Sequence, residues 1–173
     1  ASAASMRLHP CHRLDKETSG AIIYGWGKQN QKQLMGLFYE GKVSKTYIAM
    51  VKGRVAQRQG TIRSRIQDTY QRYYAAKSPG KLAVTHYRVL KYHSGFTFLE
   101  VVPETGRTHQ IRIHFARMGH PILGEGIYAF RKDFDAPFKR LALHCHRMSW
   151  PDPKTGKTVS VEAEIPPDLR KLL

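Results

Sequence analysis

The sequence predicts an α+β fold in which a largely antiparallel sheet carries few helices. Short segments rich in β-forming residues recur along the chain, and several are joined by turns, which favours hairpins. Only two segments space their apolar residues as an amphipathic helix does. With 173 residues, 41% of them hydrophobic, the chain is long enough to bury one core. We therefore expect residues 1–173 to form a single domain.

A strand, a helix and a second strand are expected in the first third of the chain. AIIYGW at 21–26 lies between glycines and predicts a buried strand. The stretch 28–42 predicts a helix, because Leu34, Leu37 and Phe38 follow helical spacing and Gly41 suits the C-terminal cap. The β-forming residues of 43–51 predict a strand with these side chains on one face: Val43, Lys45, Tyr47, Ala49 and Val51.

The remaining elements are expected to be mostly strands. Residues 60–66 predict a strand, 68–81 a loop, and 82–92 with 96–102 a hairpin that turns at 93–95. A helix is expected after Thr108, its N-cap, and before Gly119, which ends it. In this helix Ile111, His114, Phe115 and Met118 share the apolar face, and Arg112 and Arg117 point elsewhere. Two further strands are predicted at 141–150 and 158–165.

The charge of the chain indicates a polyanionic partner. Lys and Arg number 29 against 13 Asp and Glu, a formal net charge of +16. Nucleic acid, either RNA or DNA, is the first candidate; an anionic membrane surface and plain solubility remain alternatives. Tyr70, Tyr73 and Tyr74 beside Arg72 could stack on unpaired bases or pack in the core.

The cysteines and histidines do not predict a metal site or a disulfide framework. Cys11 and Cys145 are the only cysteines, which favours a reducing compartment. His144, Cys145 and His146, with Cys11 and His12, could suggest zinc. On a strand, however, the two histidines would face one side and Cys145 the other, and no CxxC or HxxxH pair supports a site.

Two polar stretches are candidate functional sites. HRLDKETSG at 12–20 places Asp15 among basic residues just before an apolar segment. Asp15 is either part of a surface turn with an incidental ion pair, or a nucleophile or base in a cationic pocket. ETGRTHQIR at 104–112 runs from a strand end into a helix, where an arginine can reach a carboxylate on a neighbouring strand.

The order and separation of three motifs resemble those of the RluA-type pseudouridine synthases. These motifs are HRLDKETSG, KTYIAMVKG and ETGRTHQIRIHFARMGHPILG, and the similarity extends through GKLAVTHYRVL and RLALHCHRMSW. It runs from Arg7 to the C-terminus. The resemblance implies a bent, mixed sheet with flanking helices and a central RNA-binding cleft. It also implies isomerisation of uridine to pseudouridine in RNA, with no metal or organic cofactor.

The resemblance assigns site residues by position. Asp15 inherits the essential catalytic role, Arg107 the pairing with that aspartate, and Tyr47 the packing on the target base. Arg13 would fill the stack that a flipped nucleotide leaves, and Leu143 would help form the uracil pocket. Arg112 is also assigned to RNA or substrate binding.

Further expectations concern the substrate and the extent of the protein. We expect ribosomal or transfer RNA as substrate, a monomer, and a cytoplasmic location, bacterial or else organellar. The N-terminal strand region that relatives carry is expected to be short or missing, and no accessory domain of the S4 type is expected. Glu125 stands where the family often has aspartate. The alternative function is RNA binding or RNA folding in the same cleft without turnover.

Overall fold

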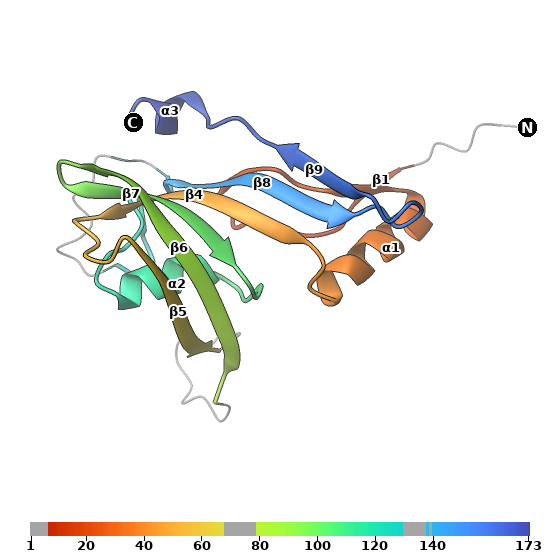
Figure 1. Ribbon diagram of the computed structural model, residues 1–173, viewed down its shortest axis with the longest axis horizontal. Coiled ribbons are helices and arrows are strands. Elements are labelled where there is room, and N and C mark those ends of the chain that lie inside the picture. Colours follow the sequence, from red (N-terminus) through yellow and green to blue (C-terminus); the bar gives the residue numbers. More distant parts are fainter. Residues whose placement is uncertain (1–6, 68–78, 130–137, 139) are drawn as a thin grey trace, which may run out of the picture.

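The computed structural model describes residues 7–67, 79–129, 138 and 140–173, and in these ranges strands outnumber helices (Figure 1). None of the described helices is both long and apolar enough to cross a membrane. In chain order the elements are β1 (Leu8–Pro10), β2 (Ser19–Gly20), β3 (Tyr24–Trp26), α1 (Gly27–Tyr39), β4 (Ser44–Lys52), β5 (Gln59–Ile66), β6 (Lys81–His93), β7 (Phe96–Pro103), α2 (Gln110–Arg117), β8 (Leu143–Pro151), β9 (Thr158–Glu162) and α3 (Pro167–Arg170).

One sheet of seven strands organises the molecule. Its order is β2-β8-β4-β7-β6-β5, and β9 also pairs with β8. All pairs are antiparallel except β2 with β8, which is parallel. The sheet bends, so that β4 and β8 run across the view of Figure 1 while β5 and β6 extend towards its bottom. The predicted α+β class, with a mixed and largely antiparallel sheet, is confirmed.

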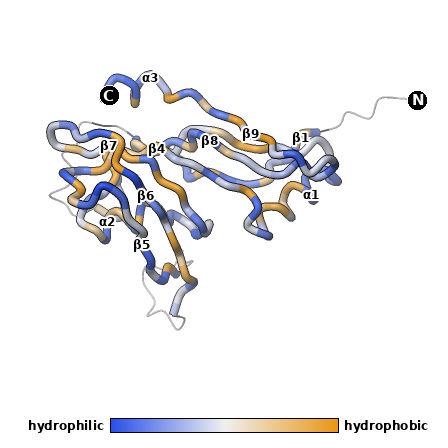
Figure 2. Tube along the Cα trace, in the orientation of Figure 1, coloured by the Kyte–Doolittle hydropathy of each residue, from blue (hydrophilic) through white to orange (hydrophobic). Residues whose placement is uncertain are grey.

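The two longer helices pack on different sheets, because β1 and β3 form a separate two-stranded sheet. Helix α1 contacts β1 and β3, whereas α2 contacts β5, β6 and β7. The main core lies between α2 and the middle strands, and hydrophobic segments follow β4 and β7 in Figure 2. Its fully buried members include Met50, Leu99 and Phe115. A smaller cluster holds Cys11 and Cys145 near α1.

The parallel pairing of β2 with β8 depends on a close approach of two backbones. Ser19 and Gly20 pair with His144 and Cys145. Gly20 has a φ of 123°, and a Cβ there would lie 2.3 Å from the Cys145 carbonyl oxygen. Because only glycine tolerates both conditions, this residue fixes the segment that follows Asp15 against β8.

Several local predictions are confirmed and two are wrong. The strand over 60–66, the hairpin turning at 93–95 and the helix ending before Gly119 are present. The buried strand over 21–26 is reduced to β3, whose Tyr24 and Trp26 are exposed because β3 pairs only with the short β1. Thr108 does not cap α2; His109 is the N-cap and makes no side-chain capping bond. The tyrosines at 70, 73 and 74 lie outside the described residues.

His114 joins α2 to the sheet and gives a pH-dependent term in stability. Its Nδ1 lies 2.9 Å from Thr85 Oγ1 and its Nε2 3.0 Å from Ser64 Oγ. Burial, and then the charge of Arg117, lowers the pKa of His114 to about 4. A histidine in the unfolded chain takes up its proton near pH 6.5. Between these values the unfolded state therefore binds more protons, and stability rises with pH.

We expect this contribution to be complete above pH 6.5 and to be lost as the pH falls to about 4. The loss should reach at most about 3 kcal/mol. Urea unfolding at pH 7.5 and pH 4.5 measures it, with His114→Gln as the comparison. The variant should lose less stability on acidification than the wild type, and equal losses in the two proteins would contradict the assignment.

Candidate active site

Asp15 lies in a turn that the sheet holds in place. The backbone N–H of Thr18 donates to the Asp15 carbonyl oxygen at 2.9 Å, closing the turn, and β2 follows at once. Because β2 pairs with β8, which in turn pairs with β4, the turn is tied to one end of the sheet. The Asp15 side chain is 21% exposed, so its carboxylate can meet both the protein interior and a ligand.

Two cationic or titratable side chains of the third motif approach the Asp15 carboxylate. Arg112 Nη1 lies 3.8 Å from Oδ2, and His109 Nε2 lies 3.7 Å from Oδ1. The expected pairing of Asp15 with Arg107 is wrong, since no ion pair joins them among the described residues. Arg107 instead donates from Nε to the carbonyl oxygen of Leu82 at 3.1 Å. It lies before α2, whereas Arg112, within the helix, is directed towards Asp15.

Arg112 connects Asp15 to a second, fully buried carboxylate. Its Nε and Nη2 donate to the two oxygens of Glu125 at 2.7 and 2.8 Å. The side chains of Arg112 and Glu125 are 6% and 0% exposed. The N–H groups of Ile127 and Tyr128 also donate to Glu125, at 2.8 and 3.2 Å. The third nitrogen of the Arg112 guanidinium group, Nη1, therefore points towards Asp15.

The charges of this pair stabilise one another. Burial would raise the pKa of Glu125, but the hydrogen bonds from Arg112 and from the two backbone N–H groups lower it overall. Burial would likewise lower the pKa of Arg112, but its hydrogen bonds to Glu125 raise it overall. Both groups therefore remain ionised at neutral pH, as a buried pair with bidentate geometry requires.

His109 occupies a backbone conformation that is rare for a residue with a side chain. Its φ is 53°, the only positive φ of a non-glycine residue among the described ranges. The ring lies 2.8 Å from the hydroxyl of Tyr128 through Nδ1. Burial lowers the pKa of His109, although the Asp15 carboxylate opposes this effect. His109 is therefore a largely neutral imidazole beside Asp15 and can donate or accept a hydrogen bond.

Gln110 orders the loop that carries Arg107. Its buried side chain accepts hydrogen bonds from Thr105 Oγ1 at 2.6 Å and from the N–H of Arg107 at 3.1 Å. Its amide Nε2 donates to the Val84 carbonyl oxygen and to Thr85 Oγ1, both at 2.9 Å. One amide thus joins the loop 105–107 to β6, which fixes the wall of the site opposite Asp15.

Tyr47 faces Asp15 from β4. A register shift between Thr46 and Tyr47 places Tyr47 opposite Cys145 on β8. Burial, and then the Cys145 thiol and the Asp15 carboxylate, raises the pKa of Tyr47 well above its ordinary value. The phenol therefore keeps its proton at neutral pH and can serve as a hydrogen-bond donor or a flat apolar surface.

These groups meet in an open cleft of about 150 Å³. Five of the six predicted site residues line it, namely Arg13, Asp15, Tyr47, Arg107 and Leu143. Arg112, the sixth, lies beneath the cleft and reaches it only through Asp15. The structure therefore brings together residues from the first motif, β4, the loop before α2 and the start of β8.

Four residues of the site were missed by the sequence reasoning. His109 and Gln110 stood inside the quoted third motif, and Lys45 opened the second, but none received a role. Glu125 was considered only because the family often has aspartate at that position. Its place 13 residues after Arg112 could have suggested it as the ion-pair partner of that arginine. Lys45 lines the cleft beside Tyr47.

The chain belongs to the family of RNA pseudouridylate synthases, whose pattern matches residues 1–117. Among similar proteins is the dual-specificity RNA pseudouridine synthase RluA of Yersinia pestis, 37% identical over 157 residues that cover 88% of this chain and 76% of that protein. Ribosomal large subunit pseudouridine synthase D of Neisseria meningitidis is also 37% identical, over 94% of this chain but 46% of its own length.

Further comparisons, with another bacterial protein and with a solved structure, agree with this family assignment. The uncharacterized RNA pseudouridine synthase YlyB of Bacillus subtilis is 36% identical over 97% of this chain and 55% of its own length. The chain thus spans about half the length of several curated relatives that it matches. A solved structure, human RNA pseudouridylate synthase domain containing 1, superposes with a TM-score of 0.81 at 26% identity, covering 94% of this chain and 72% of that one.

Proposed function

We propose that this chain converts uridine to pseudouridine in structured RNA, ribosomal or transfer, with Asp15 as the reacting carboxylate. The observation that carries the proposal is the cleft in which Asp15 faces Tyr47 and Leu143. His109 lines the cleft beside Asp15, and Arg112 approaches Asp15 from beneath. Family membership and the match to synthases from several bacteria support the reaction class.

The reaction is an isomerisation and needs no oxidant or reductant. The bond between ribose C1′ and uracil N1 breaks, the base turns, and a bond forms between C1′ and C5. The hydrogen on C5 leaves as a proton, and N1 gains one. Asp15 acts as nucleophile or as base in these steps, both of which need an ionised carboxylate. Arg112 is a positioning residue, because it acts through Asp15 and does not line the cleft.

The target base must leave its stack to reach this cleft. We assign the flat face of Tyr47 and the side chain of Leu143 to packing against the uracil, and Arg13 to the space that the flipped nucleotide leaves. The net charge of +16 supports phosphate binding over a wider surface. On β5 the exposed Arg63 and Arg65 lie on the outer face of the sheet edge.

Release of tritium from RNA labelled at C5 of uridine tests the proposed reaction. We expect release from bulk transfer RNA or ribosomal RNA in proportion to the pseudouridine formed, because C5 must lose its hydrogen. Binding of both RNAs without release from either would contradict the proposal and favour an RNA-binding protein that lacks turnover.

A further inference from the structure

Lys45 stands at the junction of two pockets. It lies on the same face of β4 as Tyr47, two residues away, and it lines both the cleft of Asp15 and a second pocket of about 280 Å³. The two pockets also share Arg13, Tyr47 and Gly106. The second pocket therefore adjoins the first, and the ammonium group of Lys45 lies near their boundary.

The ammonium group of Lys45 has no anionic partner among the described residues. The nearby Asp15 is approached by Arg112 and His109, and Glu104, the acid that lines the second pocket, pairs with His86 at 3.1 Å. Burial lowers the pKa of Lys45, which is the expected cost of a half-buried cation without a counterion. A ligand that carries a negative charge would remove this cost.

The second pocket suits a flat ring next to that charge. The rings of His12 and Phe38 lie on its wall with centroids 4.8 Å apart and planes inclined by 32°. Val43 and Cys11 add apolar surface. Burial and the charge of Lys45 act to lower the pKa of His12, although its contact with the backbone at Arg13 opposes them. His12 is therefore largely uncharged, and a base can pack against it.

We propose that the second pocket binds the nucleotide next to the target uridine, and that Lys45 neutralises the phosphate that joins the two. The inference rests on the proposed function, since it places a uridine in the first cleft. The occupant is identified by its chemistry: a base against His12 and Phe38, and a phosphodiester at Lys45. Lys45 would thus select an RNA strand over a free nucleoside.

Titrations followed by NMR on the 173-residue chain test this assignment with three probes: uridine, the dinucleotide UpU, and UpU with a neutral methylphosphonate linkage. Either base of UpU can enter the first cleft, and its single phosphate still lies between the pockets. We expect uridine to shift signals of Tyr47 and Leu143, and UpU to shift those of His12 and Phe38 as well. UpU should bind about tenfold tighter than uridine, because its phosphate gains a charged hydrogen bond.

Lys45→Met should remove most of this tenfold gain and should change the affinity for uridine by a smaller factor, because uridine carries no phosphate. In the wild type, the methylphosphonate analogue of UpU should also lack the tenfold gain in affinity. For Lys45→Met, the analogue and UpU itself should bind with the same affinity. Lys45→Arg should keep most of the tenfold gain, because it keeps the positive charge.

Lys42→Met is the matched control, because Lys42 is exposed, pairs with Glu40 at 2.6 Å and lines neither pocket. Lys45→Met should unfold at the same or a higher urea concentration than the wild type, because it removes an unpaired charge.

The outcomes separate this inference from the proposed function. If uridine binds in the first cleft but UpU binds no tighter, or if Lys45→Met leaves the gain intact, the second pocket is not a nucleotide site and the proposed function stands. If neither probe shifts any signal of the cleft, both proposals are contradicted. A lower unfolding midpoint for Lys45→Met with the UpU gain intact would assign Lys45 a structural role instead.

Discussion

Asp15→Asn should reduce turnover at least roughly 10³-fold, the scale on which loss of a reacting carboxylate acts. Asparagine keeps the shape of the side chain but can neither attack as an anion nor accept a proton at neutral pH. The fold should survive, because Arg112 keeps both hydrogen bonds to Glu125 and the turn is closed by backbone atoms. Tritium release and RNA affinity, measured side by side, give the result.

Glu17→Gln provides the matched control for that loss. Glu17 is the only other acid between His12 and Gly20, and it is exposed and does not line the cleft. Its replacement should leave release unchanged, so that a general effect of charge on RNA binding is separated from the chemistry. Turnover by Asp15→Asn within tenfold of the wild type would remove Asp15 from the reaction.

Glu125→Gln should destabilise the fold by about 3–5 kcal/mol, the usual effect of removing one partner of a buried ion pair. The remaining Arg112 is 6% exposed and would have Asp15 as its nearest anion. We expect Arg112 to move towards Asp15 and pair with it directly. Because a displacement of about 1 Å in a reacting group can cost about 10²-fold in rate, kcat should fall while KM stays close to its original value. Urea unfolding and steady-state kinetics measure the two effects.

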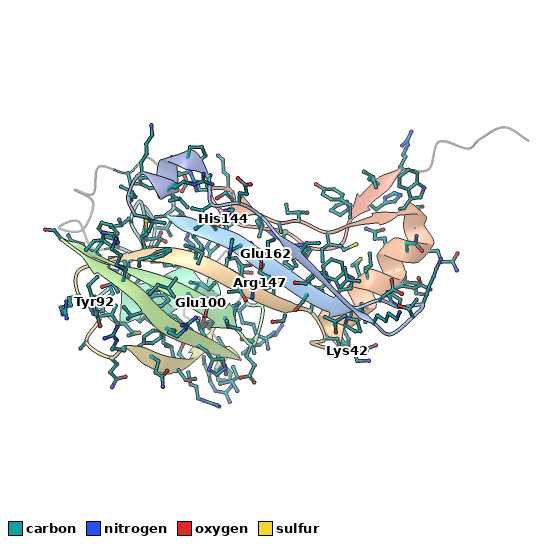
Figure 3. The ribbon with its side chains drawn as sticks, turned by 45° about the horizontal axis from the view of Figure 1, so that its top comes forward. Lys42, Tyr92, Glu100, His144, Arg147 and Glu162 are labelled. Carbon is teal, nitrogen blue, oxygen red and sulfur yellow. The ribbon has the colours of Figure 1, made fainter. Side chains whose placement is uncertain are left out.

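Glu162→Gln is the control for a pair of the same type at the surface. Arg147 Nε donates to Glu162 Oε1 at 2.7 Å across β8 and β9, and the two side chains are 50% and 54% exposed (Figure 3). An exposed pair contributes at most about 1 kcal/mol, so this variant should unfold near the wild-type midpoint. Equal losses in the two variants would show that burial of Glu125 does not determine its contribution. Glu125→Asp should recover part of the stability, since it keeps the charge.

Elements with a local signal were predicted well from the sequence. The turn at 93–95 needs only Gly95 between two β-forming runs, and α2 ends where Gly119 takes a φ of 80°. Five of the six predicted site residues line the cleft, and they were chosen because the family resemblance names them. Composition and periodicity alone predicted only the α+β class.

Features that depend on distant partners were not predicted. Ser19 and Gly20 are not β-forming residues, and they form β2 only because β8, more than 120 residues later, accepts them. Helical spacing placed Arg112 away from the apolar face, yet it is buried because Glu125 meets it there. The left-handed backbone of His109 changes the direction of the chain just before α2. For this reason the amino-acid sequence alone did not predict which arginine approaches Asp15.

The pairing of β2 with β8 also has a consequence for the time at which the site forms during synthesis. Asp15 leaves the ribosome well before His144 and Cys145, which hold its turn and lie more than 120 residues later in the chain. Contacts of such high sequence separation form late in folding. A nascent chain that stops before β8 carries the aspartate but not the site, so we expect the proposed chemistry to begin only after β8 has been synthesised.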